Sequence, residues 1–212
     1  MTRRMSLLLL AVLGLPLALA CSDSTAPAHA GSDTTGPAYA SSGVALRSSD
    51  LSELPHARAG FGFNSTAAGF PTGVVRLTGG GAFDISTASN TLPTPTSVSA
   101  SGGFDCVDAV AQGPLTGCGI NEGVRWDSAQ LLTSAGFKCT GADTPKIAVT
   151  DARTAVLLAD FYRAGDGDDA SFRAIIIISD TDLAPNLPGN QTLWVQGVGC
   201  GTDGAHFNGT IG

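Results

Sequence analysis

The segment Asp166-Gly167-Asp168-Asp169 brings together side chains that could bind a cation. This polar segment separates two of the most apolar stretches of the chain, residues 154–163 and 171–179. Carboxylate oxygens at alternate positions, with a glycine that lets the chain turn, resemble half of a calcium-binding loop. The complete spacing of such a loop is missing, and a plain hairpin turn favours the same residue types. We therefore predict a turn here, with Asp166, Asp168 and Asp169 as a candidate calcium site and no other cofactor.

A second group of carboxylates surrounds a tryptophan. Glu122 and Asp127 flank Arg125 and Trp126, and Asp160 follows further along the chain. Two carboxyl groups that face each other across a cleft can hydrolyse a glycosidic bond. In an alternating strand, however, Arg125 and Asp127 share one face while Trp126 points to the other. The pattern favours a surface ion pair over a core Trp, and leaves an envelope carbohydrate-acting hydrolase as the alternative function.

Other catalytic groups are scarce. Of the three histidines, His29 and His56 precede the predicted domain, so only His206 could serve a Ser-His-Asp triad. The nucleophile motif G-x-S-x-G is absent from the sequence. We predict no catalytic residues and favour a protein that is not an enzyme.

The N-terminal residues are similar to the signal peptide of a bacterial lipoprotein. Arg3 and Arg4 precede an almost unbroken apolar run over residues 7–19. This run is too short for a membrane-spanning helix, which needs roughly 20 residues. Ala20 followed by Cys21 resembles a lipobox, although an ordinary signal peptidase could also cut after Ala20.

The lipobox resemblance implies a signal peptide over residues 1–20, cleavage before Cys21, and acylation of Cys21 with palmitate or similar chains. Two or three acyl chains give a stable membrane anchor, whereas one chain gives a marginal anchor. Ser22 in place of Asp after the cysteine implies the outer membrane in a Gram-negative cell. We therefore expect a protein of the cell envelope whose membrane contact is its lipid anchor.

The composition changes along the chain. Residues 21–65 are dominated by Ser, Ala, Thr, Gly and Pro, which predicts a flexible tether after the lipidated cysteine. Residues 66–212 contain recurrent short apolar runs and form the predicted domain. The segment Phe61-Gly62-Phe63 fits either the tether or the first edge of this domain. The whole chain has a net charge of −7, with 11 basic residues, so we expect no nucleic-acid partner. Apart from the membrane, we expect the partner to be a protein or a small-molecule ligand.

Short apolar stretches separated by turn residues predict an all-β fold, an antiparallel β-sandwich or β-barrel. The run of isoleucines at 175–178 favours a central strand covered on both faces. Three glycines at 79–81 predict a break between two strands, and residues 107–112 form a modest helical candidate. The predicted strands cover residues 73–78, 82–86, 96–104, 123–127, 131–139, 146–150, 154–163, 171–179, 192–199 and 205–211.

Four cysteines remain when Cys21 is set aside, and an even number in an exported domain predicts two disulfides. Three pairings are possible. We favour Cys106–Cys118 because it is local and closes a loop that contains Gly and Pro, which leaves Cys139–Cys200. A metal site is disfavoured, since no C-x-x-C pair occurs and the compartment is oxidising.

Several strings of the predicted domain resemble strings found in a group of exported bacterial proteins without an assigned activity. This resemblance implies a single exported domain and carries no catalytic residue. Together with the expected anchor, it leads us to predict a non-enzymatic binding or structural role. The strings are Gly79-Gly80-Gly81-Ala82-Phe83-Asp84, Glu122-Gly123-Val124-Arg125-Trp126-Asp127, Phe137-Lys138-Cys139-Thr140-Gly141, Ala159-Asp160-Phe161-Tyr162-Arg163-Ala164-Gly165-Asp166-Gly167 and Gln196-Gly197-Val198-Gly199-Cys200-Gly201.

Overall fold

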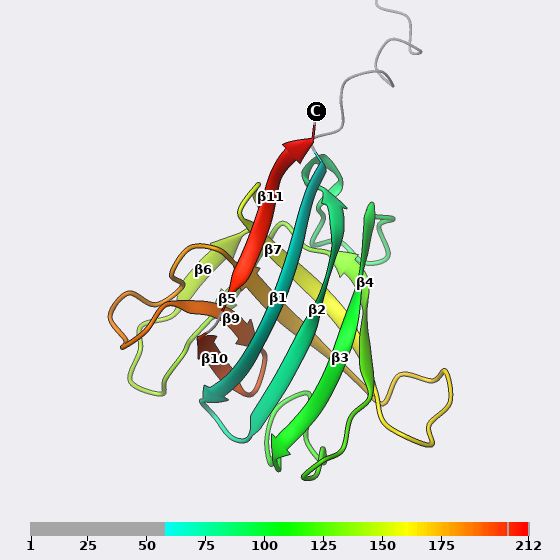
Figure 1. Ribbon diagram of the computed structural model, residues 1–212, viewed down its shortest axis with the longest axis vertical. Helices are drawn as coiled ribbons and strands as arrows, with labels where there is room; N and C mark the ends of the chain where they lie inside the picture. The colour runs from blue at the N-terminus through cyan, green and yellow to red at the C-terminus, as the bar shows by residue number, and fades with distance from the viewer. Residues whose placement is uncertain (1–57, 203, 212) are drawn as a thin grey trace, which may run out of the picture. The chain divides into compact units, whose positions relative to one another are not determined.

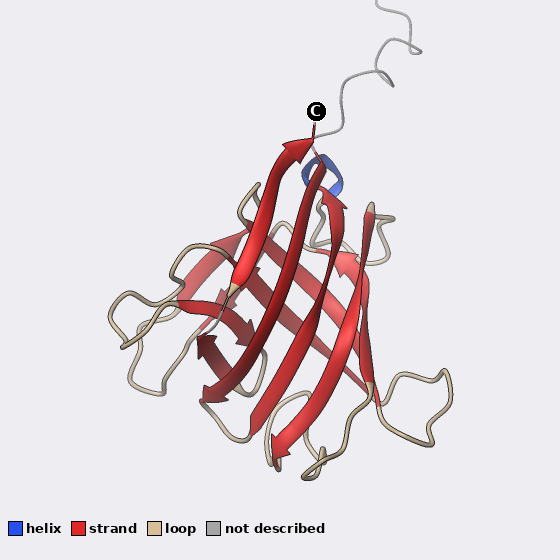
Figure 2. Cartoon of the chain, in the orientation of Figure 1, coloured by secondary structure: helices blue, strands red, loops and turns tan. Residues whose placement is uncertain are grey.

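Antiparallel strands make up most of the described chain (Figures 1 and 2). The computed structural model describes residues 58–202 and 204–211. The all-β prediction is confirmed, and the described residues contain one short 3-10 helix, η1 (Ile85–Thr87), as their helical element. The predicted signal peptide, Cys21 and residues 22–57 of the predicted tether lie outside the described residues. The strands are β1 (Arg58–Gly69), β2 (Val74–Asp84), β3 (Val98–Asp108), β4 (Arg125–Leu131), β5 (Ser134–Phe137), β6 (Lys146–Val149), β7 (Thr154–Tyr162), β8 (Phe172–Ser179), β9 (Gln191–Val195), β10 (Gly199–Thr202) and β11 (Ala205–Ile211).

Nine strands form one sheet that returns to its own first strand. Their order is β10-β9-β8-β7-β4-β3-β2-β1-β11, and β10 pairs with β1 as well as with β9. One edge of β1 pairs with β11 over residues 58–63 and with β10 over residues 66–69, while the other edge pairs with β2. In Figure 1, β1, β2 and β3 cross in front of β7, so two layers enclose one core.

The inner face of this sheet is packed with large apolar side chains. Trp126, Leu157, Phe161 and Ile176 are fully buried, and Leu193 is almost fully buried. They belong to one hydrophobic cluster that draws on strands from both layers. Burial of a side chain of this size contributes about 1.5–3 kcal/mol to the free energy of unfolding. Because side chains occupy these inner positions, a ligand is expected to bind on the outside of the sheet.

Strand β2 passes without interruption through Gly79, Gly80 and Gly81, so the predicted break was wrong. All three glycines pair with β1. A Cβ atom at Gly79 would lie 2.8 Å from Cζ2 of Trp126, whose Nε1 donates a hydrogen bond to the carbonyl oxygen of Thr78 at 3.0 Å. Glycine therefore makes room in the strand for a large core side chain instead of ending the strand.

Strand β8 is covered on both faces, as the isoleucine run predicted. Ile176 and Ile178 face the main core, while Ile177 belongs to a second hydrophobic cluster on the outer face. That second cluster includes Phe137 of β5 and Trp194 of β9. The β5–β6 hairpin is a separate two-stranded sheet. Together with Ala184 from the loop after β8, it covers the outer face here.

The first strand begins eight residues before the predicted start of the domain at residue 66. Residues 58–65, assigned to the tether with Phe61-Gly62-Phe63 as an alternative first edge of the domain, form the first part of β1. Phe61 and Phe63 are only 6% and 7% exposed, and the ring centroid of Phe61 lies 5.6 Å from that of Phe207. Alternating aromatic residues thus form a buried strand despite the Gly and Ser around them.

The predicted helix over residues 107–112 was also wrong. Val107 and Asp108 end β3, and the following residues form a loop that the Cys106–Cys118 disulfide closes. In this loop the backbone N–H of Val110 donates to the carbonyl oxygen of Cys118 at 2.9 Å. The covalent link and this hydrogen bond within the loop hold the backbone in a non-helical path.

Among the described residues there is no helix with the length and hydropathy that a membrane span requires.

Candidate functional site

The Asp166 loop is a turn in which the carboxylates of Asp166 and Asp168 have protein partners. Asp166 Oδ2 accepts hydrogen bonds from Ser171 Oγ at 2.6 Å and from Arg163 Nε at 3.4 Å. The hydrogen bond from Ser171, aided by the charge of Arg163, lowers the pKa of Asp166 despite some desolvation. Asp168 Oδ1 lies 3.1 Å from an Arg125 nitrogen, and the N–H of Asp169 donates to the carbonyl oxygen of Asp166. Among the described residues no three potential ligands cluster as a metal site, and calcium binding stays a prediction.

Two of the three carboxylates considered for hydrolysis, Asp127 and Asp160, lie next to each other. Asp127 of β4 and Asp160 of β7 are register partners on the outer face of the sheet. Asp127 lies 2.6 Å from an Arg125 nitrogen, and Asp160 accepts two hydrogen bonds from Arg173 at 2.6 and 2.9 Å. The hydrogen bonds and charge of Asp160 raise the pKa of Arg173. Both acids are thus held in ion pairs.

Trp126 and Glu122 have different surroundings from those two acids. Trp126 is fully buried inside the sheet, so it offers no platform for a sugar. The predicted surface ion pair over a core Trp is confirmed for Arg125 and Asp127. Glu122 lies 3.5 Å from an Arg163 nitrogen, and His206 is exposed on β11.

Both disulfides have the pairing that the sequence favoured. Cys106–Cys118 closes the loop after β3, and Cys139–Cys200 ties the segment after β5 to β10. All four sulfur atoms are therefore bonded, and none of these cysteines offers a thiol for catalysis or metal binding.

Three separate parts of the chain meet beside the Cys139–Cys200 disulfide. Trp194 of β9 is the register partner of Cys200, and its Nε1 donates to the carbonyl oxygen of Lys138 at 2.9 Å. The ring centroids of Trp194 and Phe137 are 6.1 Å apart. The turn between β1 and β2 is held here by the N–H of Phe70, which donates to the carbonyl oxygen of Val198 at 3.0 Å.

These parts surround a depression of about 320 Å³, which we call the aromatic pocket. Phe70 lies at the edge of the aromatic pocket and is 37% exposed, whereas Trp194 is 7% exposed. Gly141 lets Phe70 approach, because a Cβ atom there would lie 3.1 Å from the Phe70 ring. The walls of the aromatic pocket include Phe70, Pro71, Phe137, Lys138, Pro145 and Trp194.

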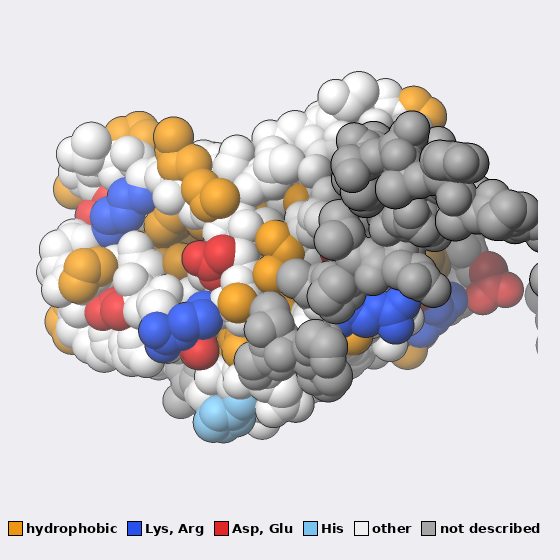
Figure 3. Space-filling view, turned by 90° about the horizontal axis from the view of Figure 1, so that it is seen from above, with side chains coloured by type: hydrophobic (Ala, Val, Ile, Leu, Met, Phe, Trp, Pro, Cys, Tyr) orange, Lys and Arg blue, Asp and Glu red, His pale blue; other side chains and the backbone are white. Residues whose placement is uncertain are grey.

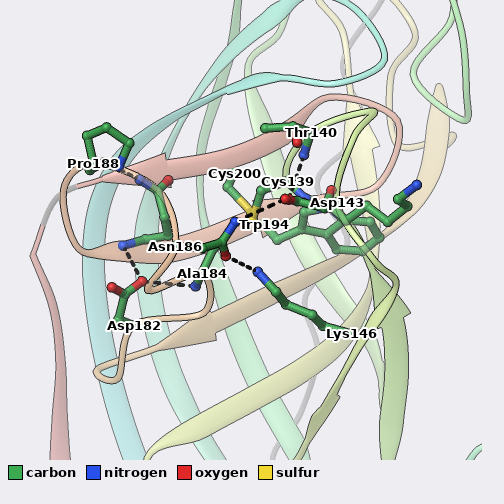
Figure 4. The surroundings of a disulfide bond; sticks show 12 residues. Cys139, Thr140, Asp143, Lys146, Asp182, Ala184, Asn186, Pro188, Trp194 and Cys200 are labelled. Atoms are coloured by element: carbon green, nitrogen blue, oxygen red, sulfur yellow. Dashed lines mark hydrogen bonds between the residues drawn. A yellow bond between two sulfur atoms is a disulfide. The ribbon is translucent and has the colours of Figure 1, made fainter.

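A polar network stabilises the segment that carries Lys138 (Figure 4). Asp143 accepts hydrogen bonds from the N–H groups of Cys139 and Thr140 at 3.2 and 3.0 Å and from the Asn186 side chain at 3.1 Å. Lys146 Nζ donates to Asn186 Oδ1 at 2.7 Å. Desolvation raises the pKa of Asp143, but the hydrogen bonds from Asn186 and Thr140 and the charge of Lys146 outweigh it, so the pKa is lowered.

Lys138 is the charged group of the aromatic pocket. Its Nζ donates to the carbonyl oxygen of Gly141 at 3.2 Å and lies 5.9 Å from the centroid of the Phe70 ring. No ion pair joins Lys138 to a carboxylate of the described residues. By contrast, five arginines pair with carboxylates. They are Arg76, Arg125, Arg153, Arg163 and Arg173.

Comparisons of the chain with protein families, with curated proteins and with solved structures found no match. The sequence analysis did not predict the aromatic pocket. Phe70, Lys138 and Trp194 are far apart in the sequence, and only the disulfide pairing of Cys139 with Cys200 indicated that two of these segments meet.

Proposed function

We propose that this chain is a cell-envelope lipoprotein, anchored through Cys21, whose β domain has a non-enzymatic binding role. The aromatic pocket is its binding site for an apolar group. The observation that carries the proposal is the convergence of Phe70, Phe137 and Trp194 around an open depression. Pockets that bind small molecules are mostly apolar with a few well-placed polar groups, and this lining has that character.

The support beneath the aromatic pocket favours binding without a large rearrangement. Trp194 and Phe137 belong to the second hydrophobic cluster, and Cys139 and Cys200 lie in the same cluster. A disulfide, a buried indole and the Asp143 network fix the walls before any ligand arrives. Preorganised walls reduce the entropy that binding costs.

The alternative, a carbohydrate-acting hydrolase, has weaker support. It needs a general acid with a raised pKa and a free partner carboxylate. Asp127 and Asp160 are each held by an arginine, and Glu122 contacts Arg163. Turnover of a glycoside that disappears in Glu122→Gln or Asp127→Asn would favour the hydrolase over the binding role.

The binding role is tested with a neutral aromatic probe, 4-phenylbutan-1-ol, which is called phenylbutanol below. A ligand that binds the folded state raises its stability and therefore the melting temperature. We expect phenylbutanol to raise the melting temperature of the purified full-length protein, and Phe70→Ser to remove most of this rise. The matched control is Leu92→Ser, which changes another exposed apolar residue outside the pocket. No rise, or an equal rise in Phe70→Ser, would contradict the proposal.

A further inference from the structure

The charge of the aromatic pocket limits which ligands it can take. Lys138 is the one ionised side chain among the lining residues, and it is not balanced by a described carboxylate. A lysine ammonium has three N–H donors, and the hydrogen bond to Gly141 accounts for one of them. The other donors are available to an acceptor that enters beside Phe70.

The acidic residue on the same segment does not neutralise this charge. Asp143 directs its carboxylate to the N–H groups of Cys139 and Thr140 and to Asn186. Lys146, the other lysine of the hairpin, is bound to Asn186 Oδ1 and does not line the aromatic pocket. On the face drawn in Figure 3, basic and acidic side chains are interspersed.

The volume of the aromatic pocket also limits the size of the ligand. A volume of about 320 Å³ is at the low end of the range for ligand pockets, roughly 300–1,000 Å³. It suits one ring with a short chain better than a long acyl chain. The aromatic side chains Phe70, Phe137 and Trp194 offer faces and edges to such a ring.

We propose that the aromatic pocket binds small monocarboxylates whose apolar body carries an aromatic ring. The ring packs against Phe70 and Trp194, and the carboxylate accepts hydrogen bonds from Lys138 Nζ. This inference rests on the proposed function, because it assigns a ligand class to the same site. It also predicts that a cationic analogue of the same shape binds more weakly than a neutral one.

The experiment compares three probes of the same shape by calorimetric titration of the full-length protein: phenylbutanoate, phenylbutanol and phenylbutylamine. A partly exposed charge pair contributes modestly, so we expect phenylbutanoate to bind about fivefold more tightly than the alcohol. Phenylbutylamine should bind most weakly. Raising the salt from about 50 mM to about 500 mM should shrink the advantage of the acid, because salt screens the pair.

Two variants distinguish the contribution of Lys138 to binding from that of Lys146. Lys138→Met keeps the apolar stem and should reduce the affinity for phenylbutanoate to that for the alcohol, whereas Lys146→Met should preserve the difference. If the alcohol binds in a Phe70-dependent manner but the acid binds no more tightly, or Lys138→Met leaves its advantage intact, the carboxylate inference is overturned and the binding role stands. If none of the probes binds, the proposed function is overturned and the inference with it.

Discussion

Removal of the Cys139–Cys200 disulfide should destabilise the domain and damage the aromatic pocket together. The bond joins residues 61 positions apart. The chain-entropy relation gives a loss of about 4 kcal/mol for a loop of this length. Cys139 and Cys200 are 1% and 6% exposed within the second hydrophobic cluster, so Cys139→Ala/Cys200→Ala also removes packed atoms there.

The Cys106–Cys118 disulfide provides the comparison. It joins residues 12 positions apart, for which the same relation gives about 3 kcal/mol. Cys106→Ala/Cys118→Ala should therefore lose somewhat less stability. It should keep phenylbutanol binding because Cys106 and Cys118 belong to the main core and not to the second hydrophobic cluster that contains Phe137 and Trp194. Urea unfolding followed by tryptophan fluorescence measures both losses, and the slope m shows whether the unfolded state has changed.

Two results would refute this reasoning. A loss below about 1 kcal/mol in Cys139→Ala/Cys200→Ala, with m unchanged, would mean that closing the long loop does not stabilise the domain. Undiminished phenylbutanol binding in that variant would mean that the disulfide does not support the walls of the pocket.

Three further predictions concern single carboxylates and the anchor. The folded-state pKa of Asp143 is lowered from its ordinary value of 3.8. The carboxylate therefore stabilises the fold above pH 3.8, and this contribution is lost as the pH falls through the lower folded-state pKa. In urea unfolding at a series of acidic pH values, the stability difference between wild type and Asp143→Asn should shrink below the folded-state pKa. If the turn at Asp166 binds calcium, added calcium should raise the melting temperature and a chelator should lower it, and Asp166→Asn should abolish both shifts. A melting temperature that neither calcium nor chelator changes would contradict a calcium site there. Mass spectrometry should find an acylated N-terminal Cys21 in protein taken from bacterial membranes, and unmodified Cys21 there would count against the anchor.

The sequence predicted those parts of the fold that depend on local patterns. The isoleucines at 175–178 indicated a strand buried on two faces, and the second hydrophobic cluster under the β5–β6 hairpin is the reason. Cysteine number and spacing favoured the observed pairing, since a loop of 12 residues closes more readily than a longer one. Alternation placed Trp126 inside and its neighbours outside.

The incorrect predictions for Gly79 to Gly81 and for the start of the domain share one physical cause. In both cases the observed structure depends on contacts with residues that are distant in the sequence. Gly79 to Gly81 indicated a break because glycine weakens an isolated strand. In the structure Gly79 leaves room for Trp126 from another strand, while Gly80 and Gly81 lie close to the backbones of β1 and β3. Phe61 and Phe63 lie in a segment of tether-like composition, and their burial depends on partners such as Phe207.

The aromatic pocket could not be predicted for the same reason. Phe70 arrives from the turn between β1 and β2, Lys138 follows β5, and Trp194 lies in β9. Their meeting depends on the register of β10 with β1 and β9 and on the long-range disulfide. No local spacing of residue types contains that information.

The two tryptophans allow the most direct test of where the domain binds. Trp126 is fully buried inside the closed sheet, whereas Trp194 lies at the aromatic pocket. In a nitrogen-15 NMR spectrum, each indole N–H gives its own signal, and Trp194→Phe assigns them. We predict that phenylbutanoate shifts the Trp194 signal and leaves that of Trp126 unchanged. A shift confined to Trp126, or no shift of either signal at millimolar ligand, would contradict the account.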